Sequence, residues 1–136
     1  MNKMLDRPIV AWNEREVTEV TIHLGHLPDS GLNPNKRLHW MQLAKLKKEA
    51  KAEAYLRCRG EWWPRVPFGT AHITITWVSK SKRRRDIDNL FASMKAYIDG
   101  IVFADVIEDD SSDCVSYSLY YLRGDEDDTI INIKKL

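Results

Sequence analysis

The chain has few cysteines and no long hydrophobic run, and both absences exclude classes of protein. Cys58 and Cys114 are too few for the disulfide framework of a small secreted protein, and they form no C-x-x-C zinc pair. No stretch of about 18 apolar residues is present, and the first residues lack the apolar core of a signal peptide. We therefore expect a cytoplasmic protein with two reduced, mostly buried thiols and no membrane contact.

A strong net charge is also missing, because the 136 residues carry a formal charge of only +1. The charges are nevertheless segregated along the chain. Between Lys36 and Arg59, eight basic residues face only Glu49 and Glu53, and residues 80–85 (the basic loop, KSKRRR) are basic at five of six positions. Acidic residues gather at 105–113 and 125–128. Such a chain can hold a basic surface around an acidic centre.

Hydrophobic periodicity predicts the order β-α-β-α-β-β. The expected strands are residues 16–24, 71–80, 114–122 and 129–136, and the expected helices are 40–58 and 89–101. The segment RGDEDD between the last two strands is typical of a hairpin turn. This order predicts one small α/β (α+β) domain over residues 16–136, a mixed sheet with two main helices on it. Residues 1–15 are expected to be a loose extension.

Two aspartates stand one residue apart in KRRRDIDNL, where a strand ends and a helix begins. Asp86 and Asp88 can project towards one point, and Asp109 and Asp110 return to the neighbourhood after the helix. Converging carboxylates must shift pKa, pair with cations or bind metal. Oxygen ligands without His or Cys favour Mg²⁺ or Mn²⁺, and nearby arginines would hold flanking phosphates.

Structural roles are open alternatives for these residues. Asp88 can simply cap a helix, Arg84 and Arg85 can be solvated, and EDDSSD can be an ordinary polar loop. Calcium loops, P-loops and serine-hydrolase motifs are absent from the sequence. His23 and His26 are expected at the surface or in the core rather than on zinc, and Trp62 and Trp63 are expected to pack under a loop rather than stack on bases.

The ordered set of motifs resembles the RusA family of Holliday junction resolvases of bacteria and their phages. The resemblance rests on RRRDIDNLFASMKAYIDGIVFADVIEDDSSDCV and on LNPNKRLHW after the first strand. It implies a small mixed α/β fold, a homodimer, Mg²⁺ or Mn²⁺, and paired nicks across a four-way DNA junction. It assigns metal binding and catalysis to Asp86, Asp88 and Asp110, with Asp109 as a neighbouring or auxiliary ligand.

The resemblance also implies a functional lysine in the helix after the aspartate pair. Lys95 is the lysine in that helix, one turn further along than the family pattern, and one turn keeps roughly the same helix face. Contacts to DNA are expected from two basic segments: Lys36, Arg37, His39, Lys82, Arg83, Arg84 and Arg85.

Two other functions fit the same residues. One is a metal-dependent nuclease for flaps or other branched DNA, and the other is a DNA-binding protein without catalysis. Intact Asp86, Asp88 and Asp110 argue against the second, because acidic groups facing phosphate weaken a pure binder. Trp40, Trp62, Trp63 and the tyrosines of YSLYY are candidates for the dimer interface.

Overall fold

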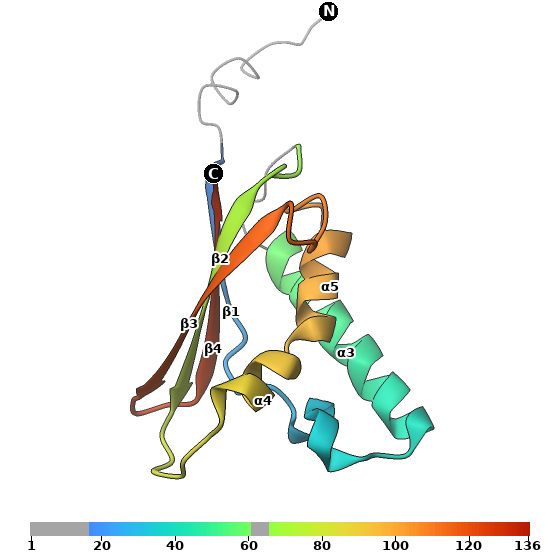
Figure 1. The fold of residues 1–136 in the computed structure, drawn as a ribbon, viewed down its shortest axis with the longest axis vertical. Coiled ribbons are helices and arrows are strands. Elements are labelled where there is room, and N and C mark those ends of the chain that lie inside the picture. Colours follow the sequence, from blue (N-terminus) through green and yellow to red (C-terminus); the bar gives the residue numbers. More distant parts are fainter. Residues whose placement is uncertain (1–16, 61–65) are drawn as a thin grey trace, which may run out of the picture.

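The computed structural model describes residues 17–60 and 66–136, which form a mixed four-stranded sheet with helices packed on one face (Figure 1). The predicted small α+β domain is therefore confirmed. The expectations for residues 1–15, Trp62 and Trp63 lie outside the described residues. In chain order the elements are β1 (Glu19–His23), η1 (Ser30–Leu32), η2 (Pro34–Lys36), α3 (Trp40–Arg59), β2 (Ala71–Ser79), α4 (Ile87–Ala92), α5 (Lys95–Phe103), β3 (Val115–Arg123) and β4 (Asp128–Lys135).

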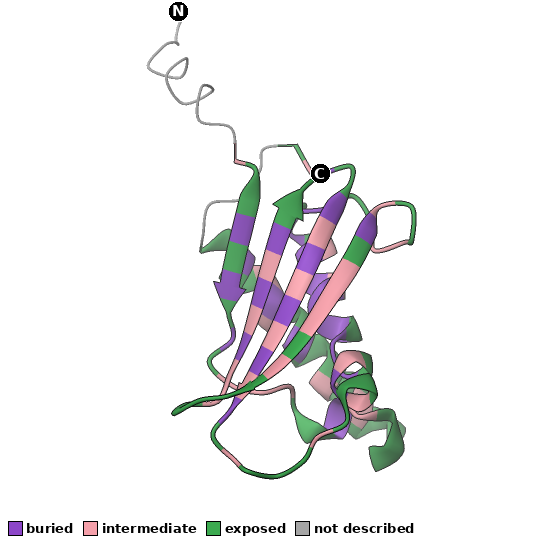
Figure 2. Cartoon of the chain, turned by 60° about the vertical axis from the view of Figure 1, so that its left-hand side comes forward, coloured by how far each residue is buried: buried purple, intermediate pink, exposed green. Residues whose placement is uncertain are grey.

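The strands alternate between the two faces of the sheet, as the period-two patterns predict. Along β2, Ile73, Ile75 and Trp77 are buried beneath the helices, and the residues between them are half-buried. On the opposite face no helix of the described chain covers the strands, and Figure 2 shows the resulting alternation of buried and more exposed bands. We call this side the open face of the sheet.

The predicted hairpin between the last two strands is wrong. The strand order is β1-β4-β2-β3, so β3 runs parallel to β2 on one side while β4 pairs antiparallel with β2 on the other. The RGDEDD segment therefore passes over the end of β2, where Lys80 N donates to Asp127 Oδ1 (2.9 Å) and Gly124 N donates to Ser79 O (3.1 Å). Burial explains the order, because the inserted β4 places Ile131 and Ile133 at the centre of the core.

The second predicted helix is divided in two. The pattern predicts one continuous helix over residues 89–101, but α4 ends at Ala92 and α5 begins at Lys95. Ser93 Oγ donates to Asn89 O (2.9 Å), a back-bond known to bend helices, and Met94 N donates to Phe91 O in a tighter turn (2.9 Å). The bend turns α5 against α3 and buries Met94 completely.

A close approach fixes how α3 and α5 pack. Gly100 of α5 faces the backbone of α3, and a Cβ added there would collide with Lys51 O and lie 2.9 Å from Ala54 Cβ. Ala50, Ala54 and Cys58 line the buried stripe of α3, as the helical pattern predicts. The small residues let the two helices lie in direct contact.

Both cysteines are free thiols, as expected. Cys58 is buried and Cys114 is half-buried, and burial raises the pKa of the Cys58 thiol to about 12. Such a thiol is unreactive at neutral pH. Among the described residues, every helix is too short or too polar to cross a bilayer.

Candidate functional site

Asp86 and Asp88 lie at the beginning of α4, and both are exposed. Asp86 is the N-cap, and its Oδ1 accepts a hydrogen bond from Asp88 N (3.1 Å). Asp88 lies in the first turn, where a carboxylate also complements the helix dipole. The capping role considered for Asp88 therefore belongs to Asp86. Neither carboxylate is buried by its structural role, so both remain open to a ligand.

The basic loop is attached to the sheet through its backbone. Arg123 Nη2 donates to Lys82 O (2.9 Å), and Tyr121 Oη donates to Arg83 O (3.4 Å). The side chains of Lys82, Arg83 and Arg84 are exposed. Because β3 holds the main chain, these cations are free to meet phosphates next to Asp86.

Arg85 differs from its neighbours in the basic loop. It is half-buried, and its Nε is buried without a hydrogen-bond partner. This placement makes Arg85 less available to DNA than the three residues before it.

The loop that contains LNPNKRLHW lies against the other side of α4. We call residues 33–39 the Asn-Pro loop. Its Asn35 Nδ2 donates to Asn89 Oδ1 (3.3 Å), next to Asp88 in the chain. Two short 3-10 turns shape it, because Asp29 accepts from Gly31 N (2.8 Å) and Asn33 accepts from Asn35 N (2.9 Å). The tertiary structure thus brings this loop to the acidic pair from far away in the sequence.

The basic residues of the Asn-Pro loop are all at the surface. Lys36, Arg37 and His39 are exposed, and Arg37 adopts a left-handed backbone conformation (φ 56°) that turns the chain into α3. His39 is the N-cap of α3 and accepts from Met41 N through Nδ1 (3.2 Å). Asp86 and Asp88 therefore lie between two exposed basic segments.

The third expected carboxylate, Asp110, comes after α5 in the chain and folds back to contact Lys95, the first residue of that helix. Its Oδ2 is 2.5 Å from Lys95 Nζ, which also bonds Asp99 Oδ1 (2.9 Å). The hydrogen bond to Asp110, followed by that to Asp99, raises the pKa of Lys95 above its usual range. The Lys95 hydrogen bond lowers the pKa of Asp110 despite some burial, so both groups are charged at neutral pH. Asp109 beside it is exposed.

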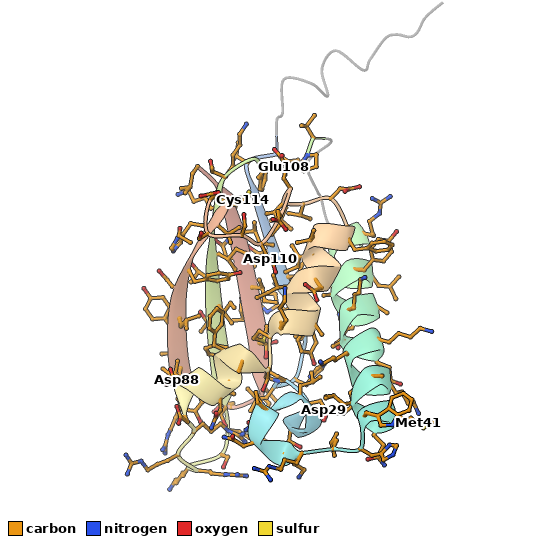
Figure 3. The ribbon with its side chains drawn as sticks, turned by 45° about the vertical axis from the view of Figure 1, so that its right-hand side comes forward. Asp29, Met41, Asp88, Glu108, Asp110 and Cys114 are labelled. Atoms are coloured by element: carbon orange, nitrogen blue, oxygen red, sulfur yellow. The ribbon has the colours of Figure 1, made fainter. Side chains whose placement is uncertain are left out.

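The expected metal-binding aspartates lie in two separate places, one at the start of α4 and the other beside α5. Figure 3 shows Asp88 at the first turn of α4 and Asp110 beside α5. Asp88 belongs to α4, whereas Asp110 contacts Lys95, the first residue of α5 beyond the bend at Ser93 and Met94. In the described part of the chain, no group of three or more His, Cys, Asp or Glu side chains could hold a metal ion.

The donors fit a divalent cation only in part. Asp86 and Asp88 supply the hard oxygen atoms that Mg²⁺ and Mn²⁺ prefer. Asp110 is neutralised by Lys95 instead, and an ion shared by all three acids would require Lys95 to release it. The structure therefore pairs Lys95 with the expected third carboxylate, and it keeps that carboxylate apart from the first two.

Several members of this arrangement were missed by the sequence analysis. Asp99 stands four residues after Lys95 on α5, a spacing that signals an ion pair. Tyr117 faces the same region from β3, where its ring packs edge-on against Phe91 at 5.0 Å. Burial, followed by the charge of Asp110, raises the pKa of Tyr117. No local signal indicates that Tyr117 or Asn35 belongs to this region.

A separate pocket of about 290 Å³ lies on the other side of α5. It is lined mainly by Asp29, Glu49, Glu53, His26 and Tyr97. Tyr97 is buried while Lys95, two residues earlier, is 67% exposed, so the pocket and the Lys95 cluster lie on different faces of α5. Its acidic lining is unfavourable for phosphate, in contrast to the basic segments beside α4.

Comparison with known proteins finds a relative of this chain but no matching family model. The chain is 32% identical over 85 residues to an uncharacterized protein of Xylella fastidiosa (strain Temecula1). The matched region is 60% of this chain and 56% of that protein, so the chain corresponds to little more than half of its relative's length.

Proposed function

We propose that the protein is a metal-dependent endodeoxyribonuclease that cleaves four-way DNA junctions by paired nicks, in DNA recombination and repair. One observation carries the proposal. The exposed pair Asp86 and Asp88 lies between the basic loop and the Asn-Pro loop, which is linked to α4 by the Asn35–Asn89 hydrogen bond. Cations on both sides offset the repulsion between these acids and a phosphodiester, and would hold the DNA backbone across them.

The residues of the chain have distinct roles in this proposal. Lys82, Arg83 and Arg84 neutralise phosphates beside the acidic pair, and the cap at Asp86 fixes where the pair stands. A divalent cation bound by Asp86 and Asp88 would supply charge stabilisation and an activated water. Lys95, 67% exposed and oriented by Asp99 and Asp110, would stabilise negative charge on the phosphoryl group.

A DNA-binding protein without catalysis is the second candidate. It is favoured by the Lys95–Asp110 ion pair, which occupies the third carboxylate and separates it from the other two. Both candidates use the same basic segments, so affinity for DNA does not distinguish them, whereas strand cleavage does.

A cleavage assay tests the proposal. Purified protein is incubated with Mg²⁺ and labelled four-way junctions, flaps or duplex, and compared with Asp88→Asn and Asp110→Asn variants. We expect both substitutions to reduce junction cleavage by at least ~10- to 100-fold, since each removes a proposed metal-binding or positioning carboxylate. Junction binding should be equal or tighter, because a negative charge facing phosphate is removed. Asp109→Asn should reduce the rate of junction cleavage less than Asp110→Asn does.

Asp113→Asn is the matched control, because Asp113 is an exposed acid of the same segment without a proposed role. Its cleavage should equal that of the wild type. Wild-type rates in Asp88→Asn and Asp110→Asn would contradict the site. Binding without cleavage of any DNA would favour the second candidate, and cleavage of flaps alone would favour a flap nuclease.

A further inference from the structure

Trp40 is a large apolar side chain that the fold leaves in solvent. It is the first residue of α3 and is 71% exposed, and the adjacent Met41 is 59% exposed. Figure 3 shows Met41 at an outer corner of the molecule, away from the sheet. Exposed apolar groups that adjoin one another often mark binding sites. Trp77, in contrast, is fully buried in the core.

The indole ring is held in position although it is exposed. The ring of His39 stacks on it, with centroids 5.8 Å apart and planes inclined by 28°. His39 is itself fixed by capping α3 through Met41 N. The chain before it is shaped by the caps at Asp29 and Asn33 and anchored by buried Leu32. A pre-oriented aromatic ring loses little conformational entropy when a ligand stacks on it.

The chain on either side of Trp40 is basic. From Lys36 to Lys48 the chain contains five basic residues and no acidic residue, and all five are exposed: Lys36, Arg37, Lys45, Lys47 and Lys48. An aromatic platform among cations is the combination that binds single-stranded nucleic acid, because phosphates meet the cations while a base stacks on the ring. This charge selects nucleic acid over an apolar protein surface as the occupant.

Trp40 also lies within reach of the acidic pair. It is five residues beyond Asn35, so the Cα atoms of Asn35 and Trp40 lie at most about 18 Å apart, and Asn35 in turn contacts Asn89, the residue after Asp88. That length corresponds to roughly five base-pair steps of B-form DNA. A nucleotide on Trp40 and a phosphodiester at Asp88 can therefore belong to the same DNA molecule.

We propose that Trp40 is a stacking platform for an unpaired base next to the branch point of the DNA. The inference rests on the proposed DNA-directed function, and it adds that the protein selects DNA with unstacked bases. The Asn-Pro loop positions the ring, and Lys45, Lys47 and Lys48 in the N-terminal half of α3 hold the adjoining strand.

The experiment measures DNA affinity without metal, so that binding is separated from cleavage. Labelled four-way junction, duplex with a single-stranded extension, and blunt duplex are titrated in EDTA with wild type, Trp40→Ala and Trp40→Phe. We expect Trp40→Ala to weaken binding to the first two DNAs by about 5- to 150-fold, and to blunt duplex by less than about twofold. Trp40→Phe should restore most of the affinity, and the salt dependence should not change.

Leu56→Ala is the matched control, because Leu56 is 65% exposed near the other end of α3. It should bind all three DNAs like the wild type. A 2-aminopurine at the unpaired position should be quenched by wild-type protein and not by Trp40→Ala. Equal losses on blunt and branched DNA, or no loss, would overturn the proposal. A changed oligomeric state with unchanged DNA affinity would also overturn it, in favour of a protein contact.

The outcome separates this inference from the proposed nuclease. Selective loss of affinity in Trp40→Ala, without cleavage by the wild type, supports the platform and overturns the nuclease. Normal cleavage by the wild type, together with no effect of Trp40→Ala on DNA affinity, supports the nuclease and overturns the platform. Failure of the wild type to bind any of the three DNAs overturns both.

Discussion

His26 is held by two short hydrogen bonds that suit its protonated form. Its Nδ1 lies 2.6 Å from Leu27 O and its Nε2 lies 2.7 Å from Glu53 Oε2, so both nitrogens face acceptors. Partial burial alone would lower the pKa of His26, and Arg57 acts in the same direction. The bonds to Leu27 and Glu53 outweigh both, and the net pKa is raised above 6.5. Folding therefore favours the charged imidazolium.

This pair predicts a pH-dependent contribution to stability. Because the folded pKa lies above the unfolded value, the stabilisation is complete below about pH 6.5 and is lost as pH rises through the folded pKa. We expect His26→Gln to lower the free energy of unfolding by about 0.5 kcal/mol at pH 5.5, since the pair is partly exposed. The two proteins should converge at pH 9 in urea titrations.

Glu53→Gln provides the companion measurement for His26. Glu53→Gln should lower the free energy of unfolding at pH 5.5 by a similar amount. The double variant should lower it by less than the sum of the two single effects, because both changes remove the same interaction. Equal effects of His26→Gln at pH 5.5 and pH 9 would show that the side chain acts through packing rather than charge.

Among the elements, the connection from β2 to α4 carries the proposed phosphate contacts. Its main chain is fixed by Arg123 and Tyr121 of β3, while Lys82, Arg83 and Arg84 extend into solvent. The same connection ends in the N-cap at Asp86. Strand, loop and helix together therefore set the spacing between cations and carboxylates.

Neutralising this loop should weaken DNA binding and flatten its salt dependence. In Arg83→Gln/Arg84→Gln/Arg85→Gln, we expect the slope of log affinity against log salt to fall by about 0.9 for each phosphate that the protein no longer neutralises. Half-buried Arg85 should contribute the least of the three. Affinity measured between 50 and 200 mM salt, a range typical of such titrations, provides the slope.

Lys51→Gln/Arg57→Gln/Arg59→Gln removes the same charge from the C-terminal half of α3 (Figure 1). That variant should keep most of the wild-type slope. If the slope falls equally in both triple variants, net charge alone explains DNA binding and the basic loop has no special role.

For the whole molecule, the open face of the sheet is the surface available to a second copy. Tyr120 is 52% exposed and Leu122 is 53% exposed on β3, and their neighbours across the sheet are Thr76 and Val78. The other tyrosines of YSLYY, Tyr117 and Tyr121, pack towards the helices. Of the tyrosines of YSLYY, Tyr120 is therefore the best placed for a contact between subunits.

We predict a homodimer at micromolar concentration, because paired nicking of a two-fold symmetric junction requires two sites in fixed relation. Tyr120→Glu/Leu122→Glu should shift sedimentation towards the monomer, since it places charge in an apolar contact. Phe103→Glu, at a side chain 63% exposed on α5, is the control and should remain dimeric. A strict monomer with and without junction DNA would favour the flap nuclease.

The sequence by itself determined the four strands, the first helix and their buried faces, because periodicity depends on neighbours along the chain. It also predicted Asp86, Asp88, Lys95 and Asp110 as site residues, and it located the basic segments. Tertiary structure alone decided that β4 lies between β1 and β2, that Asn35 meets Asn89, and that Lys95 neutralises Asp110. These are contacts between distant segments, chosen by how helices and strands bury the shared core, and no local pattern encodes them. The exposure of Trp40 has the same origin, since a tryptophan at a helix start is buried or free according to what packs against it.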